Sequence, residues 1–349
     1  MILILTKSLL EINSDTVMDW LTHYKADYDV ITGDEFMTGT SMTFQLSNAA
    51  NSIKIKTVHQ KELDLDQVKT VWFRRRMETA SFQFYEQLNF DMEGKQTLTG
   101  HLKLEFLRFY SLLPIYLKKA YWLSHPDKSS LNKLEVLILA KNFGITIPET
   151  IVCNFFDSGN QKLIYPTERY ISKPLTETAV ITDSIHRYSM LTKEVDQKTL
   201  VQDSLIFPSL LQKCIEKEFE IRTFYLSGKC YSLAIFSQES EKTKTDYRNY
   251  DTENQNRCVP YKLPKVLEKK IGKLMRALKL NAGSIDFIKT TQDEFVFLEI
   301  NPVGQFDWVA LHCNYPIEKD IAQHLIKKDN HEKRRAKNKT PLVAETIGS

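Results

Sequence analysis

The chain has 349 residues, of which 42% are hydrophobic and 26% charged, so it can bury a sizeable core. Its five cysteines are scattered without a C-x-x-C spacing, which argues against a disulfide framework or zinc site and favours a reducing cytoplasm. No apolar run approaches the roughly 18 residues of a membrane span, and the basic segment 327–340 accounts for the net charge of +3, so neither membrane nor nucleic acid is expected as a partner.

The first part of the chain alternates the patterns of strands and helices. An apolar run at residues 1–6 predicts a buried strand, and the spacing of apolar residues over 14–24 predicts a helix capped by Ser14 or Asp15. Short apolar strands follow up to residue 73, and a long helix is expected over 95–123, interrupted at Pro114. These patterns predict an α/β domain over residues 1–123.

Two further segments, 124–209 and 210–329, continue the alternation. The first opens with a capped helix that starts near Ser129 and ends at Gly144, followed by strands at 151–154 and 169–175. The second has a strand at 210–215, a hairpin that turns at Ser227 and Gly228, a helix over 264–280, two strands and a closing helix over 316–327. Residues 330–349 lack apolar periodicity and are expected to form a basic, disordered tail.

Polar side chains stand out in the two strands that precede the closing helix, S-I-D-F and F-V-F-L-E-I-N-P. Residues at even spacing share one face of a strand, so Glu299 and Asn301 point the same way, and antiparallel pairing can bring Asp286 beside them. Such oxygen atoms are costly among apolar residues unless a cation or hydrogen bonds compensate, and they suit Mg²⁺ bound together with phosphates. The pair therefore predicts a magnesium site.

This strand pair resembles the closing strands of the ATP-grasp superfamily, an α/β fold in which two subdomains hold a nucleotide behind an N-terminal pre-ATP-grasp domain. The resemblance implies that Asp286, Glu299 and Asn301 hold two Mg²⁺ ions on the phosphates of ATP, with Glu299 bridging them. Other residues follow in the order typical of the family. They would contact the nucleotide (Lys133), the phosphates (Lys173), the adenine from the hinge strand (Gln212, Lys213, Ile215) and the ribose (Glu220).

Arg222 lies in E-I-R, which is similar to the D-x-R of the RimK-like branch of the superfamily. A guanidinium at this place can bind the γ-phosphate and stabilise charge during phosphoryl transfer. One feature departs from the family pattern: the segment P-L-T-E-T-A-V-I-T-D-S (174–184) has no glycine, whereas the family has a glycine-rich flap over the phosphates. The flap is therefore shorter or built from Thr176 and Thr178.

Two N-terminal motifs narrow the resemblance to ligases that cyclise ribosomal peptides. V-W-F-R-R-R (71–76) and S-H-P-D-K-S-S-L-N-K (124–133) are similar to motifs of the microviridin-type, or graspetide, maturases and of their grasp-with-spasm group. The resemblance covers nearly the whole chain but assigns no role to Arg74, Arg75 and Arg76. It implies an ATP-dependent macrocyclase that activates Asp or Glu carboxylates of a precursor peptide with leader and core, closes esters or amides, and forms a homodimer.

Two other interpretations of the same residues remain open. The chain could be a RimK-like or glutathione-synthetase-like ligase that joins free amino acids or modifies a protein terminus. It could also be a non-catalytic nucleotide-binding module, although the intact set of Asp286, Glu299, Asn301, Lys173 and Arg222 argues against that reading. A neighbouring gene for a short peptide with repeated Thr or Ser and Asp or Glu residues would favour the cyclase.

Overall fold

The computed structural model describes residues 1–7, 11–32, 42–48, 51–57, 61–75, 89–156, 169–176, 180–182, 186–195, 204–240, 242–249, 253 and 255–339. Arg76, Thr178 and residues 340–349 of the predicted tail lie outside these ranges. The chain divides into two compact units. One consists of Met1–Ser129 and Pro316–Ser349, and the other consists of Ser130–Tyr315.

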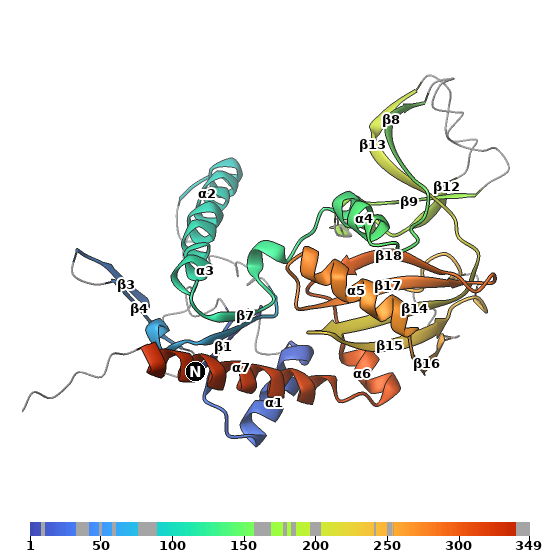
Figure 1. Ribbon diagram of the computed structural model, residues 1–349. Coiled ribbons are helices and arrows are strands. Elements are labelled where there is room, and N and C mark those ends of the chain that lie inside the picture. The colour runs from blue at the N-terminus through green and yellow to red at the C-terminus, as the bar shows by residue number, and fades with distance from the viewer. Residues whose placement is uncertain are drawn as a thin grey trace, which may run out of the picture. The chain divides into compact units, whose positions relative to one another are not determined.

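The first unit is built on a parallel sheet with the strand order β2-β1-β6-β7 (Figure 1). Its strands are β1 (Ile2–Leu5), β2 (Tyr28–Ile31), β6 (Thr70–Phe73) and β7 (Tyr121–Leu123). All four residues of β1 and of β6 are buried, as expected for the inner strands of a parallel sheet that is covered on both faces. The predicted N-terminal strand is therefore confirmed.

Several helices accompany this sheet: α1 (Ile12–His23), α2 (Met92–Tyr110), α3 (Leu112–Tyr116) and the short 3-10 helices η2 (Leu65–Gln67) and η4 (Pro126–Lys128). The cap of α1 differs from the prediction, because the side chain of Glu11 accepts the N–H of Ser14. The predicted helix over 95–123 also extends too far towards the C-terminus. Residues 121–123 form β7, whose aromatic residues suit a strand that extends the sheet.

A small antiparallel sheet completes the first unit, with β3 (Met42–Leu46), β4 (Asn51–Lys56) and β5 (Glu62–Asp64). Only one face of β4 is buried, through Ile53 and Ile55, whereas the alternating residues Lys54 and Lys56 are exposed. This alternation is the pattern of a strand with one solvated face.

The last helix, α7 (Ile317–Lys339), packs against α1, β1, β6 and β7 of the first unit. Its apolar residues Ile317, Ile321 and Leu325 are fully buried. This placement corrects the predicted segment 210–329, because the chain leaves the second unit after Tyr315. It also moves the predicted start of the tail, since the helix continues past Asn330 and Lys333 forms an ion pair one turn back with Asp329 (2.6 Å).

The second unit begins with α4 (Lys133–Asn142), whose N-terminal N–H groups are capped by the side chain of Asn132. An antiparallel sheet follows, with the strand order β12-β9-β13-β8. Its strands are β8 (Thr150–Phe156), β9 (Tyr170–Lys173), β12 (Lys193–Val195) and β13 (Ser204–Lys213). The short strands β10 (Val180–Thr182) and β11 (Arg187–Ser189) pair separately.

A five-stranded antiparallel sheet, ordered β16-β15-β14-β17-β18, forms the rest of this unit. It contains β14 (Lys217–Leu226), β15 (Lys229–Phe236), β16 (Arg257–Tyr261), β17 (Ala282–Thr290) and β18 (Phe295–Asn301), with the helices α5 (Lys265–Ala277) and α6 (Asp307–Cys313). The predicted hairpin turn is confirmed, because Ser227 and Gly228 both have positive φ angles of 45° and 104°.

The two faces of the five-stranded sheet have different environments. Helices α4 and α5 pack on one face, where Ile221, Ile285 and Phe287 join a core cluster with Leu274 and Phe297. Residues of the opposite parity, such as Arg222 and Asp286, therefore point to the other face. The core cluster anchors one face of the sheet, and the other face carries Arg222 and Asp286 beside buried apolar residues such as Phe224 and Leu233.

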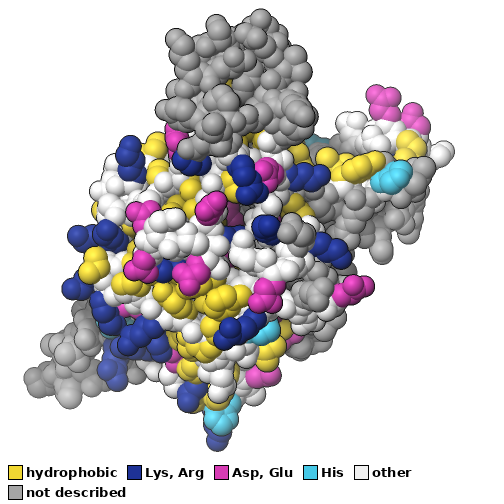
Figure 2. All heavy atoms as spheres, turned by 90° about the vertical axis from the view of Figure 1, so that its right-hand side faces the viewer, with side chains coloured by type: hydrophobic (Ala, Val, Ile, Leu, Met, Phe, Trp, Pro, Cys, Tyr) yellow, Lys and Arg dark blue, Asp and Glu magenta, His cyan; other side chains and the backbone are white. Residues whose placement is uncertain are grey.

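The surface and the helices give two further observations. In Figure 2, basic and acidic side chains are interspersed over the face shown, and neither sign forms a continuous field. Among the helices of the described residues, none is both long and apolar enough to cross a membrane.

Candidate active site

The polar face of the five-stranded sheet carries the carboxylate pair that the sequence indicates. Asp286 on β17 lies directly opposite Glu299 on β18. The pairing depends on a bulge at Leu298, because Phe287 pairs with Phe297 and the next pair skips one residue. Without this extra residue Glu299 would share the face of Phe297 and point into the core. The bulge thus turns Glu299 towards Asp286.

Arg222 on β14 pairs directly with Asp286 on the neighbouring strand β17. Its Nη1 donates to both carboxylate oxygens of Asp286, at 2.9 and 2.7 Å, and both side chains are about nine-tenths buried. Burial alone would lower the pKa of Arg222, but the charge and hydrogen bonds of Asp286, together with Tyr247 and Glu299, outweigh burial and raise this pKa above its ordinary value. The Nε–H of Arg222 is buried and has no hydrogen-bond partner in the described part of the chain.

Glu299 is surrounded by cationic groups. Its Oε2 lies 3.5 Å from the ammonium of Lys133, the first residue of α4, and its Oε1 lies 3.5 Å from Nη1 of Arg248. Lys133 also donates to the carbonyl oxygen of Pro174 at 2.9 Å, which ties α4 to the end of β9. Burial raises the pKa of Glu299, but Lys173, Lys133 and Arg248 together outweigh it and lower this pKa. Glu299 is therefore ionised at neutral pH.

Lys173, the last residue of β9, shares this environment. Burial lowers the pKa of its ammonium below the ordinary value, and the nearby charges of Lys133 and Arg248 add to this effect while Glu299 opposes it. A polyanion bound beside Lys173 would favour the charged form and reverse the shift. Such a lysine suits a phosphate site.

A pocket runs from the hinge between the two sheets to the carboxylate pair. Pro148, Ile171, Ile288 and Leu298 give it apolar walls. Seven of the predicted site residues line it: Lys173, Gln212, Lys213, Ile215, Glu220, Asp286 and Glu299. A pocket that combines apolar walls with convergent polar and charged side chains is typical of small-molecule sites.

The hinge segment offers hydrogen-bonding groups to this pocket. The backbone N–H of Lys213 donates to the carbonyl oxygen of Glu149 and that of Cys214 to Arg169, whereas the Ile215 N–H makes no such backbone bond among the described residues. The amide of Gln212 is fully buried. Its Nε2 donates to Oγ1 of Thr150 at 2.9 Å, and its Oε1 has no partner within the described ranges. A buried acceptor is thus left to be satisfied by a donor in the pocket.

Glu220 lies two residues before Arg222 on β14, so the two side chains share one face of the sheet. Its Oε1 accepts hydrogen bonds from Lys217 and from Oγ of Ser237, the latter at 2.9 Å. Burial raises the pKa of Glu220, and the bonds from Lys217 and Ser237 act against that rise. The carboxylate is therefore held in a fixed orientation at the edge of the pocket.

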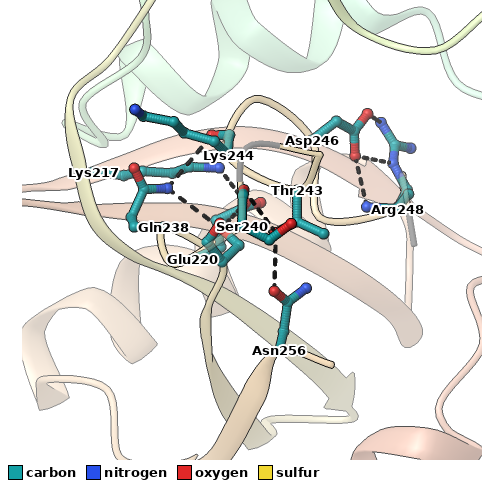
Figure 3. Close-up of polar contacts among 10 residues, drawn as sticks. Lys217, Glu220, Gln238, Ser240, Thr243, Lys244, Asp246, Arg248 and Asn256 are labelled. Atoms are coloured by element: carbon teal, nitrogen blue, oxygen red, sulfur yellow. Dashed lines mark hydrogen bonds and ion pairs between the residues drawn. The ribbon is translucent and has the colours of Figure 1, made fainter. Parts of the chain in front are cut away.

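The loop between β15 and β16 brings in residues that the sequence did not single out (Figure 3). Asp246 accepts a forked pair of hydrogen bonds from Arg248, Nε to Oδ1 at 2.9 Å and Nη2 to Oδ2 at 2.8 Å, which aims Nη1 at Glu299. Thr243 donates to the Ser237 carbonyl at 2.9 Å and so closes the loop on itself. The sequence feature that could have pointed to this loop is the motif T-D-Y-R at 245–248, where polar side chains cluster.

Two of the predicted site residues, Asn301 and Arg222, do not line the pocket. Asn301 stands at the end of β18 with an exposed side chain, and its Oδ1 accepts the N–H of Val303 at 3.1 Å. Arg222 does not line the pocket and lies behind Asp286, whereas Arg248 is the guanidinium that reaches it. The structure therefore brings Lys133, Lys173, Asp286 and Glu299 together, whereas Arg222 is separated from the pocket by Asp286.

The donor set fits a divalent cation that arrives with a nucleotide. Among the described residues no group of three or more His, Cys, Asp or Glu side chains could form a metal cage by itself. Asp286 and Glu299 supply two adjacent carboxylates, and Mg²⁺ is commonly held by one or two carboxylates, with phosphate oxygens and water completing its shell.

No protein-family model and no curated protein sequence matches the chain. Solved structures are similar over nearly its whole length. A RiPP-associated ATP-grasp ligase from Chryseobacterium gregarium, in complex with ADP and a leader and core peptide, is 26% identical with a TM-score of 0.82 and covers 94% of this chain and 96% of its own.

Two further structures show the same fold at lower identity. The macrocyclase MdnC from Microcystis aeruginosa MRC, bound with the precursor peptide MdnA, is 24% identical with a TM-score of 0.75 and covers 93% of this chain and 99% of its own. The ATP-grasp ligase PsnB, complexed with a precursor variant, Mg and ADP, is 15% identical with a TM-score of 0.68 and covers 94% of this chain and 98% of its own.

The two antiparallel sheets of the second unit, the carboxylate pair on β17 and β18 and these full-length similarities all point to the same fold. The expected α/β ATP-grasp fold is confirmed, and over nearly its whole length the chain is similar to solved ATP-grasp ligases.

Proposed function

We propose that the chain activates side-chain carboxylates of a ribosomal precursor peptide with ATP and closes rings within that peptide. The observation that carries the proposal is the pocket that ends at Asp286 and Glu299 and is flanked by Lys133, Lys173 and Arg248. This arrangement occurs in a chain that matches a RiPP-associated ligase solved with leader and core peptide.

The nucleotide would lie in the pocket with its base at the hinge. The apolar walls suit a flat ring, and the unpartnered Oε1 of Gln212 suits the amino group of adenine. The N–H of Ile215 and the carbonyl oxygen of Lys213 would pair with the edge of the base. Glu220, held by Ser237, would accept the hydroxyls of the ribose.

The triphosphate would extend from the ribose to the carboxylate pair. Lys173 and Lys133 would contact its oxygens, which explains why so many cations gather around Glu299. Two Mg²⁺ ions, when held by Asp286, Glu299 and Asn301, would neutralise charge on the β- and γ-phosphates. In the absence of phosphates, Lys133 and Arg248 serve as counterions for Glu299.

Chemistry would start when an Asp or Glu carboxylate of the peptide attacks the γ-phosphorus of ATP. The bond to the β-phosphate oxygen breaks, ADP leaves, and an acyl phosphate remains on the peptide. The orphan Nε–H of Arg222 gives this charge a donor, because Asp286 occupies only Nη1. Arg248 would approach the same group from the pocket.

Ring closure would follow when a hydroxyl of Ser or Thr, or an amine of Lys, attacks the acyl carbon. Inorganic phosphate leaves, the nucleophile loses its proton, and the peptide has lost one water in total. We expect an ester as the main product and a leader segment that binds away from the chemistry. We also expect a homodimer, in which each protomer carries its own site.

The experiment incubates the full chain with ATP, Mg²⁺ and a full-length precursor, its separated core, or a mixture of free amino acids. Mass spectrometry measures the peptide, and a coupled assay measures ADP. The proposal predicts loss of one water mass for each ADP formed, with faster reaction when the leader is attached. Treatment with mild base then separates esters, which open, from amides, which do not.

Two results would count against the proposal. A gain of mass from added amino acids would favour a RimK-like or glutathione-synthetase-like ligase instead. ADP formation that does not depend on any carboxylate substrate would favour a nucleotide-binding module with idle hydrolysis.

A further inference from the structure

Gly304 lies in the loop that follows β18, where the chain turns back over the start of β17. Its N–H donates to the carbonyl oxygen of Asn301 at 3.2 Å, and Oγ of Ser284 donates to the carbonyl oxygen of Gln305 at 3.2 Å. Ser284 is fully buried and pairs in register with Asn301. The loop is therefore fastened directly onto the strand that carries Asp286.

No room exists for a side chain at Gly304. A Cβ there would lie 2.6 Å from both Cβ and Oγ of Ser284 and 3.0 Å from Nη2 of Arg222. Its backbone lies outside the left-handed region, so an alanine would be excluded by contact and not by conformation. Ser284 belongs to an inner strand and cannot move aside easily, so the loop or the guanidinium would have to shift.

This contact falls on the side of Arg222 that Asp286 leaves unoccupied. Asp286 accepts from Nη1, whereas Nη2 faces Gly304 and Nε is buried without a partner in the described residues. The guanidinium is thus fixed between a carboxylate on one side and bare backbone on the other. A planar fork keeps its direction only when its neighbours prevent rotation.

We infer that Gly304 is a positioning residue, whose missing side chain lets the loop close against Arg222 and hold its guanidinium in register with Asp286. The inference rests on the proposed function for its kinetic effect, because Arg222 is there the donor to the transferring phosphoryl group. Its structural part concerns only the orientation of Arg222 and can be measured without turnover.

The test compares Gly304→Ala with Gly100→Ala in the full chain. Gly100 is a matched control because it lies within α2, and a Cβ there would meet no atom within 4 Å. A second variant, Ser284→Gly combined with Gly304→Ala, removes the closest clash but keeps the contact with Arg222. Ser284→Gly alone shows the effect of that change.

Three readouts are measured for each variant: kcat and KM for ATP from ADP formation with peptide, the midpoint of thermal unfolding, and NMR spectra of ¹⁵N-arginine-labelled protein. Arg222→Lys identifies the signals of Arg222. We expect Gly304→Ala to lower kcat by about 10- to 10²-fold with KM for ATP within about threefold of wild type, and to broaden or shift the Arg222 signals. The double variant should regain the unfolding midpoint but not kcat, and Gly100→Ala should match wild type in kcat, KM and the Arg222 signals, with an equal or higher unfolding midpoint.

Recovery of kcat together with stability in the double variant would overturn the inference, because Gly304 would then matter only for packing. Unchanged Arg222 signals in Gly304→Ala would overturn it as well. If wild type forms no ADP with any peptide, the proposed function fails, but the NMR comparison still decides whether Gly304 orients Arg222.

Discussion

The buried ion pair between Arg222 and Asp286 leads to a prediction about stability and activity together. Replacing Arg222 with Met keeps much of the volume but leaves the Asp286 carboxylate, which is 8% exposed, without its counterion. Removing one partner of a buried pair commonly costs about 3–5 kcal/mol. For a unit of this size, about 2–4 °C is lost per kcal/mol, so the unfolding midpoint should fall by roughly 6–20 °C.

The assay is a double-mutant cycle with Arg222→Met, Asp286→Leu and both changes together, followed by thermal and denaturant unfolding. Because the double variant has no uncompensated charge, it should be more stable than either single variant while remaining inactive. The reasoning would be refuted if Arg222→Met cost less than about 1 kcal/mol, or if the two single effects simply added in the double variant.

Three other predictions concern single side chains. Glu299→Gln should keep the fold but lower turnover by at least about 10²-fold, and electron paramagnetic resonance should no longer detect Mn²⁺ bound in the presence of ADP; normal Mn²⁺ binding would contradict the metal assignment. Because burial lowers the pKa of Lys173, ADP affinity should weaken as pH rises through a value below that of an ordinary lysine, and calorimetry of Lys173→Arg should show no such loss. Burial, with Lys327 and Lys328 nearby, lowers the pKa of His324 from 6.5 to about 4, so unfolding free energy should fall as pH drops from 6.5 to 4, and His324→Gln should flatten that dependence.

Part of this site could be predicted because it depends on local patterns. The polar residues on β17 and β18, in strands expected to pair antiparallel, were enough to predict that Asp286 and Glu299 lie close together, although their exact pairing depends on the bulge. The hairpin at Ser227 and Gly228 was equally predictable, since both residues have the positive φ angles that a tight turn requires.

Other features depend on contacts that no local pattern encodes. The bulge at Leu298 replaces a regular pair in an apolar strand and leaves no distinctive residue behind. Arg248 reaches Glu299 from a loop some fifty positions earlier in the chain, and only the tertiary fold brings them within 3.5 Å. Helix α7 has a charged sequence throughout its last turns, so its continuation past Asn330 reflects ion pairs such as Lys333 with Asp329.

The assignment of individual nucleotide contacts to Lys133, Gln212 and Glu220 stays a prediction, because it requires the bound nucleotide. The geometry adds one refinement to the expected roles. Arg222 is committed to Asp286 through Nη1 and does not line the pocket, whereas Arg248 does, so Arg248 would contact a transferring phosphoryl group directly and Arg222 would act from behind Asp286.

The most direct test of carboxylate activation follows the oxygen atoms. A precursor whose Asp and Glu side-chain carboxylates carry ¹⁸O is incubated with the chain, unlabelled ATP and Mg²⁺, and the released phosphate is examined by mass spectrometry. If an acyl phosphate forms, the oxygen that joins the acyl carbon to phosphorus leaves with the phosphate, so one ¹⁸O should appear in inorganic phosphate for each ring closed. Release of unlabelled phosphate together with ring closure, or formation of AMP in place of ADP, would contradict the account.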